Sequence, residues 1–209
     1  YKPKPGGISQ AEQSYFVSKG LLFKVPTEAH RLSAGLGRDW PASRGGFIVR
    51  TQDLCVWCNE EDHVRIICRR EGADLAGAMT QINSYAQEME AQLRSQGSGF
   101  AYHDRLGYVT VDPTHLGSAL RCSVSLRLPA LGARPGFVEL CSRLRLEGAW
   151  RSGFWEVSNR PSLGLSEAGV ITTVVEGCAK LVALEQRLYS GGSIDDDQRR
   201  LLGYATSGR

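Results

Sequence analysis

The sequence predicts an α+β fold in which an antiparallel β-sheet is flanked by helices. Short apolar runs bounded by turn residues indicate strands, and they cluster along the chain instead of alternating one for one with helices. Two long segments with apolar residues at steps of three and four predict helices that cover the sheet. With 209 residues, 42% of them hydrophobic, the chain is large enough to bury a full core in one domain.

The first half of the chain predicts a short helix, three strands and a long helix. Ser9 begins a short amphipathic segment that ends near Lys19. Strands are expected over 47–50, 54–59 and 62–70, and their short connections favour an antiparallel meander. The long helix is expected over 73–96, because Asp74 lies near its start and Gly97 just past its end. Its apolar stripe comprises Leu75, Met79, Ile82, Ala86, Met89 and Leu93.

The second half predicts three strands and two helices. Strands are expected over 107–111, 120–128 and 154–158, and a short helix over 134–144. The second long helix is expected over 166–189, with Ser166 as its cap and Gly191 as its stop. Its buried stripe comprises Val170, Val174, Cys178, Leu181 and Leu188. We expect one domain over 11–203, a flexible lead over 1–10 and a flexible tail over 204–209.

Composition narrows the classes of partner. The formal net charge is +3 and the 25 basic residues are dispersed along the chain, which argues against a nucleic-acid or anionic-membrane partner and leaves a small anionic ligand open. No apolar run approaches the roughly 18 residues of a membrane span, and the first seven residues lack the apolar core of a signal peptide, so we expect a cytoplasmic protein.

The six cysteines predict core packing and no metal site. Most lie in apolar periodic segments, where a free thiol behaves as a small hydrophobic group. Cys55 and Cys58 form a Cys-x-x-Cys, but residues three apart on a strand point to opposite faces. A second Cys or His pair that could complete a zinc site is missing from the sequence pattern, so no metal ligands are expected.

The most informative segment runs Asn59-Glu60-Glu61-Asp62-His63-Val64-Arg65 and places four charges and a histidine beside an apolar strand. It resembles the signature of the phosphagen (guanidino) kinases, most closely of the creatine kinases. The resemblance extends from about Ile8 to Asp196 and matches the C-terminal catalytic domain of that family. Further matching motifs follow in family order: Leu21-Leu22-Phe23, Ser33-Ala34-Gly35, Arg38-Asp39-Trp40-Pro41, Arg44-Gly45, Val56-Trp57, Leu106-Gly107-Tyr108-Val109, Pro113-Thr114, Leu116-Gly117, Val157-Ser158-Asn159, Leu163-Gly164 and Ser193-Ile194-Asp195-Asp196.

The resemblance implies a phosphoryl-transfer site that uses ATP or ADP with magnesium. Arginine suits such a site because its planar fork pairs with phosphate bidentately. Arg65 and Arg121 match family arginines that contact the nucleotide phosphates, and Arg151 stands in for an arginine of the family's mobile loop. Glu61 matches the carboxylate that positions the substrate guanidinium and takes its proton.

The same resemblance also indicates lost parts. We expect the family's helical N-terminal domain to be absent, together with the arginine-rich stretch that follows it. Asp112 occupies the place of the reactive cysteine, and Gly20 and Ser125 occupy the places of two histidines at the nucleotide. The mobile loop that closes over the reactants is reduced to a hairpin over 148–156.

These losses favour a catalytically inactive relative that serves as a structural or interaction module, with at most residual nucleotide binding. The alternative is an active phosphagen kinase, either with Asp112 in the role of the thiolate or with a missing N-terminal region supplied by a longer precursor. Expected partners are the chain itself, a true creatine kinase-like protein or a larger assembly.

The conspicuous residues also have plain structural interpretations. Arg65 could form a surface ion pair with Glu61 or Asp62, and Asp112 could start a turn before Pro113. A further group is expected to serve the framework: Glu60 and Asp62 as scaffold, His63 as a hydrogen-bonded structural histidine, Trp40 and Trp57 in the core, and Gly45-Gly46 as a turn.

Overall fold

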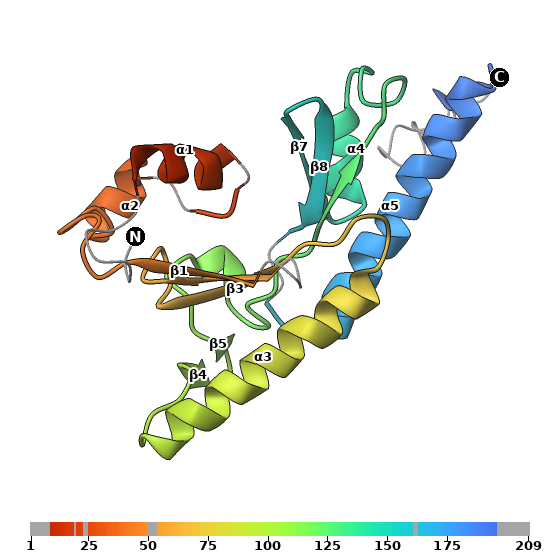
Figure 1. Cartoon of the computed structure of the whole chain (residues 1–209). Coiled ribbons are helices and arrows are strands. Elements are labelled where there is room, and N and C mark those ends of the chain that lie inside the picture. The colour runs from red at the N-terminus through yellow and green to blue at the C-terminus, as the bar shows by residue number, and fades with distance from the viewer. Residues whose placement is uncertain (1–8, 19, 23–24, 50–53, 161–162, 196–209) are drawn as a thin grey trace. The chain divides into compact units, whose positions relative to one another are not determined.

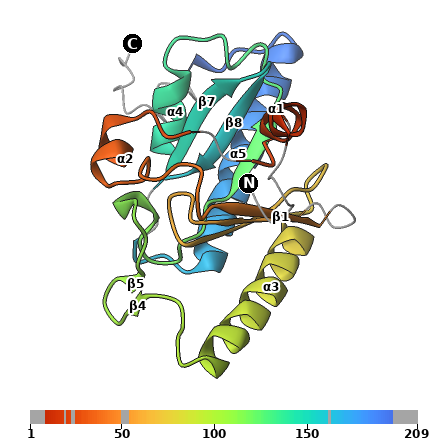
Figure 2. The same cartoon turned by 60° about the vertical axis from the view of Figure 1, so that its left-hand side comes forward.

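The computed structural model describes residues 9–18, 20–22, 25–49, 54–160 and 163–195 (Figures 1 and 2). The chain divides into two compact units, Tyr1–Phe100 and Ala101–Arg209, which are described separately below. Most of the predicted flexible lead over 1–10 and all of the predicted tail over 204–209 lie outside the described residues, and the single domain over 11–203 stays a prediction.

The first unit opens with two helices. Helix α1 (Gln10–Ser18) begins at a capping box in which the Glu12 amide donates to Ser9 Oγ at 3.3 Å and the Ser9 amide donates to Glu12 Oε2 at 2.9 Å. Helix α2 (Ala29–Ser33) is a single short piece that follows a loop. The predicted N-terminal helix is therefore confirmed.

A three-stranded antiparallel sheet follows, with the order β1-β2-β3. Its strands are β1 (Gly45–Val49), β2 (Leu54–Cys58) and β3 (Val64–Cys68), which confirms the predicted meander. The predicted turn at Gly45-Gly46 is wrong, because both glycines pair with β2, Gly46 opposite Trp57. Pairing along the whole strand outweighs the local turn preference of two glycines.

Helix α3 (Leu75–Ser95) packs against β3. Asp74 caps it by accepting a hydrogen bond from the Gly77 amide at 2.9 Å, and the chain leaves the helix through Gly97, whose φ is +76°. Both predicted ends are confirmed within two residues. The predicted apolar stripe is half-buried, and Ala78 is the fully buried residue of this helix.

The second unit begins with a small hairpin of β4 (Tyr102–His103) and β5 (Gly107–Tyr108). The strand predicted over 107–111 is too long. It ends after Tyr108 because the Thr110 hydroxyl donates to the Asp112 carbonyl at 2.8 Å and turns the chain into a 3₁₀ helix, η2 (Pro113–His115).

The main sheet of the second unit has the antiparallel order β6-β8-β7. Its strands are β6 (Ser123–Leu126), β7 (Leu146–Arg151) and β8 (Phe154–Asn159). Helix α4 (Phe137–Arg143) packs on β7, and helix α5 (Glu167–Tyr189) packs on all three strands (Figure 2). The resulting core contains nearly inaccessible residues: Leu131, Leu140, Cys141, Leu146, Val157, Val170, Val174, Leu181 and Ile194. The predicted α+β class is thereby confirmed.

A buried glutamate joins α5 to the segment between β6 and α4. The carboxylate of Glu185 accepts the amide of Ala130 at 2.9 Å and the amide of Leu131 at 2.6 Å. Glu185 is buried, whereas Leu188, which the sequence pattern placed on the buried stripe, is half-buried. The charge is tolerated there because two backbone donors satisfy it.

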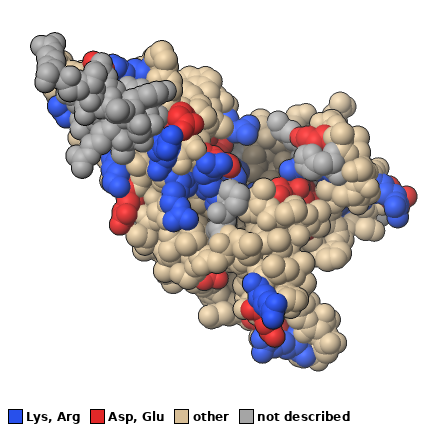
Figure 3. All heavy atoms as spheres, turned by 180° about the vertical axis from the view of Figure 1, so that it is seen from behind, with Lys and Arg blue, Asp and Glu red and all other residues tan. Residues whose placement is uncertain are grey.

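The outer surface carries charges of both signs. On the face shown in Figure 3, Lys and Arg side chains lie beside Asp and Glu side chains. In the part of the chain that the structure describes, no helix combines the length and apolarity needed to cross a bilayer.

Candidate functional site

Residues Asn59 to His63 connect β2 to β3 as a tightly bonded turn, and Val64 and Arg65 are the first two residues of β3. The Asn59 amide donates to the His63 carbonyl at 3.0 Å, and Asn59 Oδ1 lies 3.1 Å from His63 Nδ1. Asn59 Nδ2 also donates to the Ser43 carbonyl at 2.9 Å. His63 is thus the hydrogen-bonded structural histidine that the sequence predicted.

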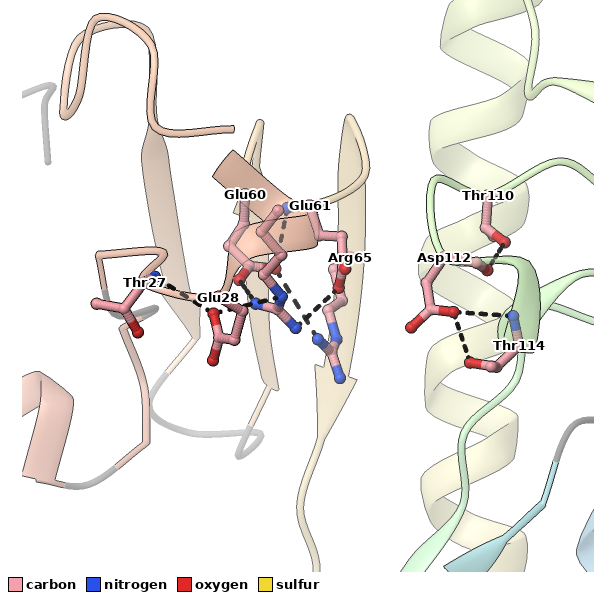
Figure 4. Close-up of polar contacts among 9 residues, drawn as sticks. Thr27, Glu28, Glu60, Glu61, Arg65, Thr110, Asp112 and Thr114 are labelled. Atoms are coloured by element: carbon pink, nitrogen blue, oxygen red, sulfur yellow. Dashed lines mark hydrogen bonds and ion pairs between the residues drawn. The ribbon is translucent and has the colours of Figure 1, made fainter. Parts of the chain in front are cut away.

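The two glutamates of this turn meet the guanidinium of Arg31, which comes from α2. Arg31 Nη2 lies 3.3 Å from Glu61 Oε2, and Arg31 Nη1 lies 3.4 Å from Glu60 Oε1. Figure 4 shows Glu60 and Glu61 among their polar contacts, with Glu28 beside them. The Glu61 side chain is only 5% exposed, so its charge is compensated mainly inside the protein.

Arg65 joins this cluster through the other glutamate. Its Nη1 lies 3.9 Å from Glu60 Oε2, and its guanidinium carbon lies 5.5 Å from the centre of the Trp57 ring. The predicted surface pair with Glu61 or Asp62 is therefore replaced by a pair with Glu60 and a cation–π contact. Trp57 is half-buried as a stacking partner of Arg65, not fully buried as predicted for a core residue.

Trp40 has the same arrangement with another arginine. The Arg44 guanidinium lies 5.2 Å from the centre of its ring, and Trp40 is half-buried. A hollow of about 400 Å³ adjoins these residues in the first unit. Its lining includes Arg38, Arg44, Glu60, Glu61 and His63.

In the second unit, Asp112 caps a turn. Its Oδ1 accepts hydrogen bonds from the Thr114 amide at 2.9 Å and from Thr114 Oγ1 at 2.8 Å, as Figure 4 shows. These contacts fix the start of η2. The turn-forming interpretation of Asp112 accounts for its geometry.

The two other predicted phosphate-binding arginines also have partners in the second unit. Arg121 Nη2 donates to Ser158 Oγ at 3.0 Å, and Arg121 Nη1 lies 3.8 Å from Glu147 Oε2. Arg151 Nε lies 3.1 Å from Glu156 Oε2 on the neighbouring strand. The exposed fractions of the side chains are 38% for Arg121 and 69% for Arg151, so both remain accessible to an anion.

Strands β7 and β8 form a regular hairpin with a two-residue turn. Six residue pairs join them without interruption, from Leu146 opposite Asn159 to Arg151 opposite Phe154. The turn residues Ser152 and Gly153 have φ values of +48° and +89°, the signs of a type I′ turn. This is the hairpin that the sequence predicted in place of a mobile loop.

All six cysteines are free thiols. Burial raises the pKa of Cys55, Cys58 and Cys122, and raises the pKa of Cys141 to about 12 and that of Cys178 to about 11. A thiol with a raised pKa is a poor nucleophile at neutral pH, so these five resemble packing residues. Among the described residues, no group of three His, Cys, Asp or Glu side chains could hold a metal ion.

The sequence pattern missed Arg31. It lies 29 and 30 positions before the two glutamates that it contacts, and the fold alone brings these side chains together. The structure thus brings Glu60 and Glu61 together at Arg31 in the first unit, and Arg65 joins them through Glu60. Asp112, Arg121 and Arg151 belong to the second unit, where each has local partners.

Comparison with known proteins gives consistent matches. The model of the ATP:guanido phosphotransferase C-terminal catalytic domain matches residues 6–188. Creatine kinase B-type from Gallus gallus is 34% identical over 197 residues, which cover 90% of this chain and 52% of that protein. Creatine kinase testis isozyme from Oncorhynchus mykiss is 33% identical, with 90% and 51% covered. The chain therefore spans about half the length of these curated relatives.

Solved structures of two further kinases share the fold. A lombricine kinase superposes with a TM-score of 0.84 at 27% identity, covering 91% of this chain and 55% of that one. The substrate-free duplicated taurocyamine kinase from Schistosoma mansoni superposes with a TM-score of 0.78 at 31% identity, covering 90% and 27%. The likeness thus extends over nine-tenths of the chain in both comparisons.

Proposed function

The chain belongs to the ATP:guanido phosphotransferase family, and on that premise we propose that it is a member that does not transfer phosphate. In this proposal the catalytic-domain fold serves as a structural or interaction module. Binding of ATP or ADP with magnesium, where it persists, is weak.

The observation that carries this proposal is the β7–β8 hairpin. A closing loop must exclude water from the phosphoryl group and complete the set of charges around it. Here the two strands are paired up to a two-residue turn, so this segment has no length to fold over a ligand. Arg151, the arginine at its tip, is paired with Glu156 on the same hairpin.

The contacts of the other predicted residues support the proposal. Asp112 is engaged in a turn cap through Thr114, a role that needs no chemistry. A side chain at Gly20, where the family resemblance implies a histidine, would place its Cβ 2.7 Å from Arg69 Nη2. A histidine there would require this flexible guanidinium to shift, and it would take the left-handed φ of +61° that glycine adopts most easily.

The arginines that remain are consistent with weak nucleotide binding. Arg65 and Arg121 are each 38% exposed and are held by ion pairs of 3.9 and 3.8 Å. The Arg121–Glu147 pair is exposed at both ends and contributes only about 0–1 kcal/mol, so an anion can displace it, whereas the Glu60 side chain that pairs with Arg65 is only 10% exposed. These guanidinium groups would hold phosphate oxygens, and bound magnesium would neutralise the phosphate charge.

The test is phosphoryl transfer itself. The purified protein, expressed from its complete open reading frame, is incubated with ATP, magnesium and creatine, taurocyamine or lombricine, and ADP release is followed by a coupled assay. An authentic creatine kinase in the same buffer provides the positive control. We expect no release above the background without acceptor, and turnover approaching that of the control refutes the proposal.

An active enzyme is the second candidate. The observation in its favour is that Glu61, Arg65 and Arg121, three residues expected at the reaction centre, are all present, with both arginines accessible. An active enzyme requires appreciable affinity for its nucleotide, so magnesium and ATP should raise its melting temperature. Absence of any stabilisation at millimolar ATP contradicts this candidate.

For partners we propose another copy of the chain, a true creatine kinase-like protein or a larger assembly in the cytoplasm. Affinity purification from native tissue followed by mass spectrometry, with analytical ultracentrifugation of the pure protein, distinguishes these partners.

A further inference from the structure

Glu61 poses an electrostatic problem that the fold solves with a guanidinium. Among the described residues, Glu61 and Glu185 are the buried carboxylates. Glu185 is satisfied by two backbone amides, whereas Glu61 faces the side chain of Arg31. A buried carboxylate needs such a partner because its charge is otherwise poorly solvated.

The cluster surrounds the Arg31 guanidinium with three carboxylates. Nη2 faces Glu61 at 3.3 Å, Nη1 faces Glu60 at 3.4 Å, and Nε lies 3.8 Å from Glu28 Oε2. A guanidinium at the centre of converging carboxylates is the same arrangement that would bind the guanidino group of a small molecule.

The fit of Arg31 in this cluster is loose. Charge-assisted hydrogen bonds between nitrogen and carboxylate oxygen are optimal at about 2.7–2.9 Å, shorter than any of the three contacts. Arg31 Nε is buried and makes no hydrogen bond within the described part of the chain. Its position is limited by its tether to α2, a helix of only five residues. A free guanidinium has no such constraint and can approach both glutamates more closely.

Space for a small ligand adjoins the two glutamates. Glu60 and Glu61 both line the hollow of about 400 Å³ in the first unit. We propose that Glu60 and Glu61 form a guanidinium-binding site that is occupied by the chain's own Arg31, which thereby excludes free guanidino compounds. The inference rests on the proposed function in taking guanidino compounds as the ligand class.

A tethered group competes effectively because it is always present near its site. A flexible tether corresponds to an effective concentration of about millimolar or more, and an external ligand must overcome it. The apparent affinity for a free guanidino compound falls by the fraction of molecules in which Arg31 has left the glutamates. Removal of Arg31 should therefore reveal binding that the wild type conceals.

The test uses methylguanidinium and two variants of Arg31. R31A removes the whole side chain beyond Cβ, and R31Q removes the charge while keeping a shorter, polar amide side chain. Saturation-transfer NMR and thermal shift at low millimolar methylguanidinium, with methylammonium at the same ionic strength as control, measure binding. We expect both variants to bind methylguanidinium about tenfold or more tightly than the wild type, and to bind creatine or taurocyamine more tightly too.

The site is assigned by second substitutions in the R31A background. R31A/E61Q should lose the gained binding, whereas R31A/E71Q should keep it, because Glu71 is exposed after β3. If R31A is unfolded alone, recovery of its folded circular dichroism spectrum by methylguanidinium supports the proposal. Equal binding by R31Q and the wild type, or binding that survives E61Q, overturns it.

These experiments involve neither nucleotide nor turnover. A failure to bind methylguanidinium therefore leaves the proposed absence of phosphoryl transfer intact. Turnover by the wild type would refute the proposed function. The difference in methylguanidinium binding between R31A and R31A/E61Q would still decide whether Arg31 occupies a guanidinium site.

Discussion

Replacing Glu185 with alanine should destabilise the second unit strongly, because this carboxylate is buried on the face of α5 that packs against the core. Its carboxylate accepts two backbone amides, from Ala130 at 2.9 Å and from Leu131 at 2.6 Å. Leu131 is only 1% exposed, so its amide cannot turn to water when the acceptor is removed. The substitution leaves a buried donor without a partner.

The expected loss of unfolding free energy can be worked out from these two hydrogen bonds. A hydrogen bond to a charged acceptor contributes about 1.5–3 kcal/mol, and we assign this range to the buried Leu131 amide. The Ala130 amide is partly accessible and can recover a bond to water, so its loss adds about 0.5–1 kcal/mol. The free energy of unfolding should therefore fall by about 2–4 kcal/mol in E185A. In E185Q the loss should be smaller, because one amide oxygen can still accept.

Urea denaturation followed by circular dichroism provides the measurement. The matched control is E176A, which removes an exposed glutamate from the same helix and should change the unfolding free energy by less than about 0.5 kcal/mol. Hydrogen exchange should show reduced protection of the Leu131 amide in E185A. If E185A is as stable as E176A, the two amides are not held as described and the reasoning fails.

Three further predictions concern the hairpin, a thiol and an arginine. G153A should lower the unfolding free energy by about 1 kcal/mol, because Gly153 has a φ of +89°; the space around the new Cβ is open, so this backbone strain is the only cost. The control S152G should not destabilise the turn. Equal stability of G153A and the wild type in urea would contradict the prediction. Burial raises the pKa of Cys141 from 9.0 to about 12, so the protonated thiol stabilises the folded state below pH 9, and this stabilisation is lost as the pH rises toward 12. Between these pH values the unfolding free energy of the wild type should fall more steeply than that of C141A, by about 1.4 kcal/mol per pH unit. Parallel curves of unfolding free energy against pH for the two proteins would contradict this prediction. E147Q releases Arg121 from its ion pair and should tighten binding of ATP with magnesium by up to about fivefold in calorimetry, a prediction that weaker binding would refute.

Local signals made much of the fold predictable. The N-terminal ends of α3 and α5 are predictable from Asp74 and Ser166, whose side chains accept hydrogen bonds from backbone amides three residues later. The β1-β2-β3 meander follows from apolar runs with short connections. These features depend on neighbours in the sequence, and the pattern contains that information directly.

Other features depend on residues that are distant in the sequence. Glu185 interrupts an apolar stripe, and its meaning emerges only from the backbone amides of a segment 54 and 55 positions away. In the same way, the motif identified Glu61 as important but gave no indication that Arg31 would contact it. A charged residue in an apolar segment indicates that its side chain needs a hydrogen-bond or ion-pair partner, and the tertiary fold decides which residue supplies it.

The two-residue turn of the β7–β8 hairpin also makes this position suitable for inserting a longer segment. Its strands stay in register up to an exposed tip, so a longer segment inserted between Arg151 and Phe154 would leave and re-enter the sheet at fixed positions. Lengthening the turn from two residues to about twelve costs only about 1.5 kcal/mol of loop-closure entropy. Insertion of a longer loop is therefore thermodynamically accessible, and the chain can serve as a host in which the contribution of an inserted loop is measured by itself.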